Sequence, residues 1–172
     1  MIIWITGLSG VGKTTVAKNV VEKMRSRNQP TIFLDGDELR SILKTEAFEE
    51  DFTPEARLSN SLVYAKLCEF LSNQGLHVVI STISMFKEVY QWNRENFSDK
   101  YLLVYLKAPL QQLIERDPKG LYQKYDTGLI KEVAGLDIPV CEPENPDLVI
   151  ENFGENTASK NAEIIVKRVL DA

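Results

Sequence analysis

The chain has 172 residues, 44% of them hydrophobic and 26% charged, a composition typical of one globular core and not of a disordered segment. Its formal net charge of −5 argues against a nucleic-acid-binding surface. No apolar stretch is long enough to span a membrane, and Cys68 and Cys141 have no metal-ligand spacing. We therefore expect a cytoplasmic protein with reduced thiols and with neither nucleic-acid nor membrane partners.

The first apolar run, Ile2–Thr6, is predicted to be a strand, and it leads directly into a glycine-rich segment. Residues 7–14, the phosphate loop (P-loop), fit the pattern G-x-x-x-x-G-K-[S/T]. In this pattern backbone N–H groups surround an anion, the lysine neutralises phosphate charge, and the next hydroxyl ligates Mg²⁺. A strand-to-helix turn with a chance lysine is the weaker reading, because strand and helix patterns flank the motif. The predicted triphosphate contacts are Gly7, Ser9, Gly10, Val11, Gly12, Lys13, Thr14 and Thr15.

Helix 14–27 is expected next, with its N-terminus directed at the phosphates. Strand Thr31–Asp35 is expected to follow it, and then a short helix after Asp37. Ligands of open α/β sheets bind at the carboxyl ends of strands, so the carboxylates here point toward the γ-phosphate. Transfer of a phosphoryl group from the triphosphate needs a group that orients the hydroxyl of the acceptor molecule and takes its proton. Asp37 is predicted to be this base. Asp35 is expected to support Mg²⁺ through water or to fix the loop, and Arg40 to meet an anionic part of the acceptor. The plainer reading is an Asp-Gly turn with an acidic helix start.

A long helix is predicted over 54–74, where a Thr-Pro pair marks its start and a glycine its end. Its expected apolar stripe is Val63, Leu67, Phe70 and Leu71. A second face carries Arg57, Asn60 and Tyr64. Spacing alone leaves two readings of that face equal: a grip on a nucleotide, or the solvated side of an amphipathic helix.

The remaining apolar runs complete an alternation of strands and helices. Strands are expected over 77–82, 101–106 and 147–151. A last helix is expected over 157–170, with Ala162, Ile165, Val166 and Val169 at core spacing. Such alternation is typical of a doubly wound α/β fold. The sequence thus predicts a five-stranded, mostly parallel sheet with helices on both faces.

Several of these segments together resemble adenylylsulfate (APS) kinases over nearly the full chain. They are residues 7–15, 34–37 with Arg40, Phe52 with Arg57 and Asn60, 83–84, 116–122 and 142–146. The phosphate loop is shared by many nucleoside triphosphatases. Its combination with Asp-Pro-Lys-Gly-Leu-Tyr, residues 117–122, is highly specific.

The resemblance implies a P-loop kinase that transfers the γ-phosphoryl group of ATP, with Mg²⁺, to the ribose 3′-hydroxyl of a nucleotide, usually APS. It implies one kinase domain over 1–172, a homodimer, and a mobile lid over about 116–137. The lid concentrates cations that would close over two anionic nucleotides and exclude water. By resemblance the catalytic residues are Lys13, Asp37 and Lys119, Arg116 joins the ATP site, and the acceptor site comprises Asp37, Arg40, Phe52, Arg57, Asn60, Ile83, Ser84, Lys119 and the position of Val133.

Departures from the family pattern gather on the acceptor side. Where APS kinases carry a Phe that stacks on the acceptor adenine, this chain has Val133. Stacking of a ring on a base contributes about 1 to 3 kcal/mol, enough to shift base preference. Residues 80–86 and 92–94 resemble a branch that includes cytidine diphosphoramidate kinases of capsule synthesis. The acceptor thus stays open between APS and cytidine diphosphoramidate. The sequence lacks the motifs expected of a regulatory nucleotide hydrolase.

Overall fold

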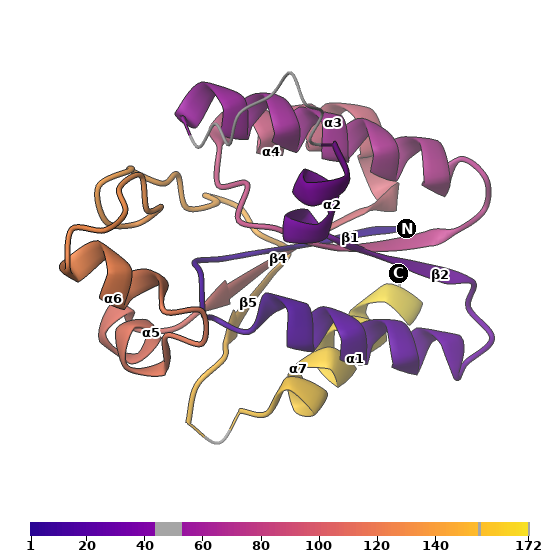
Figure 1. Ribbon diagram of the computed structural model, residues 1–172. Helices are drawn as coiled ribbons and strands as arrows, with labels where there is room; N and C mark the ends of the chain where they lie inside the picture. Colours follow the sequence, from indigo (N-terminus) through magenta and orange to yellow (C-terminus); the bar gives the residue numbers. More distant parts are fainter. Residues whose placement is uncertain (44–52, 155, 172) are drawn as a thin grey trace.

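The chain is described here from a computed structural model that covers residues 1–43, 53–154 and 156–171. A central sheet carries helices on both faces (Figure 1). Its strand order is β2-β3-β1-β4-β5, and every neighbouring pair is parallel, which confirms the predicted doubly wound fold. The strands are β1 (Ile2–Thr6), β2 (Thr31–Asp35), β3 (His77–Ser81), β4 (Tyr101–Lys107) and β5 (Leu148–Glu151).

The central strand β1 is buried along its whole length, as its unbroken apolar sequence requires. Alternate side chains serve the two faces of the sheet. Ile3 and Ile5 pack in one core cluster with α1 (Lys13–Arg25) and α7 (Ala158–Leu170). Ile2 and Trp4 pack in the other, with α3 (Pro54–Ser72) and α4 (Lys87–Phe97). The predicted strand therefore forms because both of its faces are covered.

The predicted apolar stripe of α3 is wrong for two of its four residues. Val63 and Phe70 are 44% and 65% exposed, while Leu67 and Leu71 pack only at the margin of the core. The buried face instead consists of Ser61, Tyr64, Ala65 and Cys68. Small side chains let the helix approach the sheet closely, and the Tyr64 hydroxyl donates a hydrogen bond to the Gly36 carbonyl at 3.3 Å. Size and hydrogen bonding therefore select the buried face, and hydrophobicity alone misplaces it.

The other helices agree with the sequence in part. The last predicted helix is α7, and it buries the residues expected for its core face, Ala162, Ile165, Val166 and Val169. The short helix expected near Asp37 is α2 (Gly36–Leu43). No element was predicted where α4, the 3₁₀ turn η1 (Ser98–Lys100), α5 (Leu110–Arg116) and α6 (Leu121–Asp126) form. Within the described ranges, no helix is long and apolar enough to cross a membrane.

The parallel arrangement brings the functional segments to one edge of the sheet. β1 ends at Thr6, before the phosphate loop, and β2 ends at Asp35, at the start of α2. β3 ends at Ser81, beside Asp35 in the strand register. Because all of these strands run in the same direction, their carboxyl ends define one ligand-binding crevice.

Candidate active site

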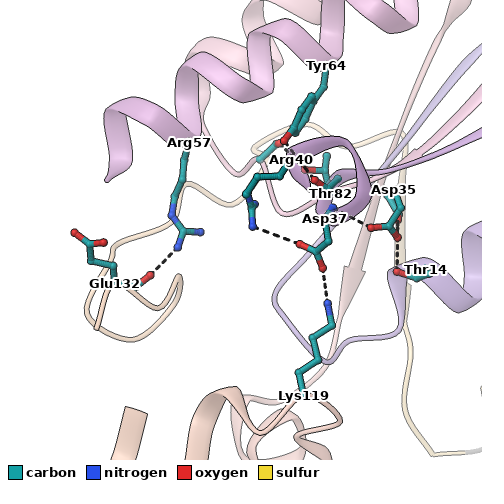
Figure 2. Close-up of polar contacts among 12 residues, drawn as sticks. Thr14, Asp35, Asp37, Arg40, Arg57, Tyr64, Thr82, Lys119 and Glu132 are labelled. Carbon is teal, nitrogen blue, oxygen red and sulfur yellow. Dashed lines mark hydrogen bonds and ion pairs between the residues drawn. The ribbon is translucent and has the colours of Figure 1, made fainter. Parts of the chain in front are cut away.

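A cleft of about 730 Å³ lies at the carboxyl edge of the sheet. The phosphate loop and the ends of β2 and β3 form one wall, and residues 118–134 form the other. Figure 2 shows Asp37 between these walls, with Lys119 reaching it from the second wall. The predicted site residues that line the cleft are Ser9, Gly10, Gly12, Lys13, Thr14, Thr15, Asp35, Asp37, Arg40, Arg57, Ile83, Lys119 and Val133.

The lysine of the phosphate loop, Lys13, lies in the cleft and is held there by the loop backbone. Lys13 Nζ donates a hydrogen bond to the Leu8 carbonyl at 2.9 Å. Burial lowers the pKa of Lys13 to about 8, although the nearby carboxylate of Asp37 acts to raise it. Gly12 has a φ of +93°, in the left-handed region that favours glycine. A bound triphosphate would supply the negative charge that stabilises the lysine cation.

Asp35 organises the side of the cleft opposite Lys119. One carboxylate oxygen accepts hydrogen bonds from Thr14 Oγ1 at 2.8 Å and from Ser81 Oγ at 2.9 Å. The other oxygen accepts the backbone N–H of Asp37 at 2.9 Å. Asp35 therefore fixes both the Thr14 hydroxyl and the start of α2 (Figure 2). A hydroxyl and a carboxylate side by side fit Mg²⁺, which takes few protein oxygens and completes its shell with phosphate and water.

Asp37 lies among cations and is held ionised by them. Its carboxylate pairs with the Lys119 ammonium, and its Oδ1 lies 3.5 Å from Arg40 Nη1 (Figure 2). Partial burial acts to raise the pKa of Asp37, but the hydrogen bond and charge of Lys119, with Arg40 and Lys13, lower it overall. An ionised carboxylate between the phosphate loop and an open cleft has the position required of a proton acceptor.

A cavity of about 30 Å³ adjoins the cleft on the side of α3. The predicted acceptor residues Arg40, Arg57, Asn60, Ile83 and Ser84 all line it. Burial lowers the pKa of Arg57, whose guanidinium donates a hydrogen bond to the Glu132 carbonyl at 2.7 Å. The polar face of α3 thus borders the site and contacts the second wall, although Tyr64 is buried and not part of a polar surface. Phe52 lies outside the described residues.

Ser84 sits in a buried network of hydroxyl groups. Its Oγ lies 2.7 Å from both Ser61 Oγ and Thr82 Oγ1. Its φ of +27° is rare for a residue with a side chain. Thr6 Oγ1 donates to the Ile83 carbonyl next to it, so the network fixes the loop after β3. Ser61, which sequence reasoning did not assign to the site, is part of this support.

The first half of the segment predicted as a lid is built around Asp117. Its carboxylate accepts the backbone N–H groups of Leu121 at 2.8 Å and Gln123 at 2.9 Å, which caps α6. The Tyr122 hydroxyl donates to the Ser9 carbonyl at 3.0 Å, which attaches α6 to the phosphate loop. Lys119, between the cap and the helix, is thereby directed at Asp37. In the Asp-Pro-Lys-Gly-Leu-Tyr segment, Asp117 and Tyr122 thus hold the backbone in place, and Lys119 contacts Asp37.

The second half of this segment is closed by Asp137. Its carboxylate accepts the backbone N–H groups of Glu132 at 2.8 Å and Val133 at 2.6 Å. Val133 is 3% exposed and lines the cleft. A Cβ on Gly135 would lie 2.8 Å from the Leu8 side chain, so this turn also packs on the phosphate loop. The segment therefore spans from the donor side of the cleft to Arg57 on α3.

Three predicted ATP-site residues lie away from the cleft lining. Gly7 and Val11 belong to the phosphate loop but do not line the cleft, and Val11 is buried. Arg116 Nη1 donates a hydrogen bond to the Asn152 carbonyl at 3.0 Å. Asn152 was not predicted, yet its side chain donates to the Val11 carbonyl at 2.6 Å. The available signal was its place directly after a strand, at the carboxyl edge of the sheet.

Comparisons with known proteins identify the family of the chain. A protein-family profile described as adenylylsulphate kinase matches residues 1–151. The cytidine diphosphoramidate kinase of Campylobacter jejuni is 41% identical over 168 residues, 98% of this chain and 95% of that protein. A probable adenylyl-sulfate kinase of Pyrococcus abyssi is 34% identical, over 96% of this chain and 92% of that protein.

Among solved structures, the APS kinase CysC of Mycobacterium tuberculosis, in complex with AMPPNP and APS, superposes with a TM-score of 0.89 at 31% identity. The superposition covers 99% of this chain and 97% of that one. Sequence profile, relatives and fold therefore agree, and the chain belongs to the adenylylsulfate kinase family of P-loop phosphotransferases.

Proposed function

We propose that this protein transfers the γ-phosphoryl group of Mg-ATP to the ribose 3′-hydroxyl of a 5′-modified nucleotide. The observation that carries the proposal is the position of Asp37, an ionised carboxylate between Lys13 of the phosphate loop and the acceptor-side arginines. In this reaction Asp37 orients the hydroxyl and takes its proton. Lys13 and Lys119 offset the negative charge on the transferred group.

The magnesium ion would be held by the phosphates and Thr14, with Asp35 behind it. The chemistry that it would supply there is neutralisation of the charge that develops on the transferred phosphoryl group. The hydrogen bond from Thr14 to Asp35 fixes the hydroxyl in place before the ion arrives. A homodimer, implied by the family resemblance, stays a prediction.

For the acceptor we favour cytidine diphosphoramidate. Val133 supplies only a short aliphatic surface to the cleft, so an adenine base would find no stacking ring at this position. The relative that is named for the cytidine substrate is 41% identical to this chain, whereas the Pyrococcus adenylyl-sulfate kinase is 34% identical. APS is the second candidate, because the matching profile is named for that kinase.

A substrate panel tests both candidates directly. We expect ADP release from Mg-ATP to depend on the acceptor, with a higher kcat/KM for cytidine diphosphoramidate than for APS. Related 5′-modified cytidine and adenosine nucleotides separate the contribution of the base from that of the 5′ group. A higher kcat/KM for APS would reverse the assignment of the acceptor, and acceptor-independent release would indicate a hydrolase.

Val133→Phe should shift base preference toward adenine. The backbone N–H of residue 133 is held by Asp137, so a larger side chain there is directed at the cleft that Val133 now lines. We expect the ratio of kcat/KM for adenosine over cytidine acceptors to rise about tenfold, because stacking contributes about 1 to 3 kcal/mol. Val63→Phe, the same change at an exposed site on α3, is the control and should leave the ratio unaltered. An unaltered ratio in Val133→Phe as well would remove this residue as a determinant of base choice.

A further inference from the structure

Two asparagines link the phosphate loop to the last helix. Asn152 follows β5, and its Nδ2 donates to the Val11 carbonyl at 2.6 Å. Its Oδ1 accepts a hydrogen bond from Asn161 Nδ2, also at 2.6 Å. Asn161 lies on α7 and is only 2% exposed. We infer that the pair Asn152 and Asn161 orients the peptide between Val11 and Gly12 and so sets the affinity for Mg-ATP, an inference that rests on the proposed use of Mg-ATP as donor.

The argument follows from the geometry of one peptide bond. A trans peptide is planar, and its C=O and N–H groups point in opposite directions. Because Asn152 holds the Val11 carbonyl on its own side, the Gly12 N–H is directed to the other side. Gly12 lines the cleft, whereas neither Asn152 nor Val11 does. Backbone N–H groups at this point of a phosphate loop bind the α- and β-phosphates.

Asn161 is needed because an amide side chain has two ends. The NH₂ end of Asn152 donates and its oxygen only accepts, so rotating the amide by half a turn would place two acceptors against each other at Val11. The hydrogen bond from Asn161 to the Asn152 oxygen selects the productive orientation. The amide also lies directly against the loop, since a Cβ on Gly12 would approach Asn152 Nδ2 to 2.6 Å.

The backbone of Asn152 is fixed independently of its side chain. Its N–H donates to the Lys107 carbonyl at 2.8 Å, at the end of β4. Its carbonyl accepts from Arg116 at 3.0 Å, at the end of α5. The side chain therefore starts from a defined position, and a change at Asn161 acts mainly on the direction of the Asn152 amide.

The test is Asn161→Asp, which keeps the shape of the side chain but replaces the donor with an acceptor. The carboxylate would attract the Asn152 NH₂ and turn the Asn152 oxygen toward Val11. We expect the Kd for Mg-ATP, measured by titration calorimetry, to rise about tenfold, the effect of losing one buried hydrogen bond. The α- and β-phosphates are bound equally in ground and transition states, so kcat and the acceptor KM should change less than about twofold.

Two further variants make the result decisive. Asn152→Ala removes the donor itself and should weaken Mg-ATP to a similar extent, even if Asn161→Asp fails to fold. Asn156→Asp is the matched control, because this exposed residue precedes α7 and, among the described residues, its side-chain amide donates to the Glu151 carbonyl alone, at 3.0 Å. It should bind Mg-ATP as the wild type does.

Unchanged Mg-ATP affinity in the folded Asn161→Asp or Asn152→Ala protein would overturn the inference. So would an equal loss of Mg-ATP affinity, kcat and acceptor binding, which indicates general destabilisation. A wild-type protein that does not bind Mg-ATP would overturn the proposed donor and this inference with it. Weakened Mg-ATP binding in Asn161→Asp cannot come from a direct contact, because Asn161 does not line the cleft.

Discussion

Lys13→Ala should reduce kcat/KM by a factor of about a hundred to a thousand, the range seen when one transition-state donor is removed. Lys13 is the cation of the phosphate loop, and its ammonium already lies in the cleft, held by the Leu8 carbonyl at 2.9 Å. Without it the γ-phosphoryl charge loses its main counter-charge on the donor side. Steady-state ADP release with acceptor present measures the loss. Turnover near that of the wild type would refute the assignment of this loop.

Lys13→Arg keeps the positive charge of the phosphate loop but does not lose its proton in the pH range of interest. It therefore serves as the control for the pH dependence of Mg-ATP binding. Burial lowers the pKa of free Lys13 to about 8, and bound phosphate would raise it, so binding of Mg-ATP above that pH takes up a proton. The Kd of the wild type should therefore rise as the pH increases from about 7 to about 9.5. Arginine stays protonated over this range, so the variant should bind Mg-ATP more weakly but without that pH dependence. A flat profile for the wild type would contradict the lowered pKa.

The sheet was predictable because its strands obey one strong rule. Strands covered on both faces are apolar throughout, and β1, a continuous run that is buried along its length, shows this clearly. The predicted strand ends differ from the observed ones by no more than one residue. The failures are helices, where burial depends on fit: α3 buries Ser61 and exposes Phe70. Which residues of such a helix are buried depends on how well their side-chain volumes fit against the sheet, and hydrophobicity alone does not predict this fit.

The phosphate-loop part of the candidate site could be proposed from the sequence because its residues are consecutive and each has a chemical reason. The contacts that close the cleft could not be predicted in this way, because Lys119 and Asp37 are 82 residues apart in the sequence. Resemblance placed both in one site, but their ion pair depends on the cap that Asp117 makes for α6. Asn152 could not be assigned to the site from the sequence for a similar reason. An asparagine after a strand usually signals a turn, and only the fold shows that it contacts the phosphate loop.

Asp37→Asn should lower kcat by about a hundredfold to ten-thousandfold, the usual contribution of a positioned base, while the Kd for Mg-ATP changes far less. Asparagine keeps an oxygen that can accept from Lys119 but cannot take a proton from the acceptor hydroxyl. The fold should persist, because the Asp37 and Lys119 side chains are 56% and 61% exposed and exposed ion pairs contribute little. Single-turnover measurements with saturating Mg-ATP isolate the chemical step. An unchanged kcat would remove Asp37 as the base.

Glu38→Gln is the matched control, since it makes the same change of charge at the exposed neighbouring residue of α2, which does not line the cleft. It should leave kcat unaltered. In the free protein Lys119 lowers the pKa of Asp37 by pairing with it, so Asp37 is ionised at neutral pH but poorly basic. We expect it to gain basicity when the Lys119 ammonium moves to the phosphate of a bound nucleotide. Until phosphate is bound, Asp37 would therefore remain a weak base.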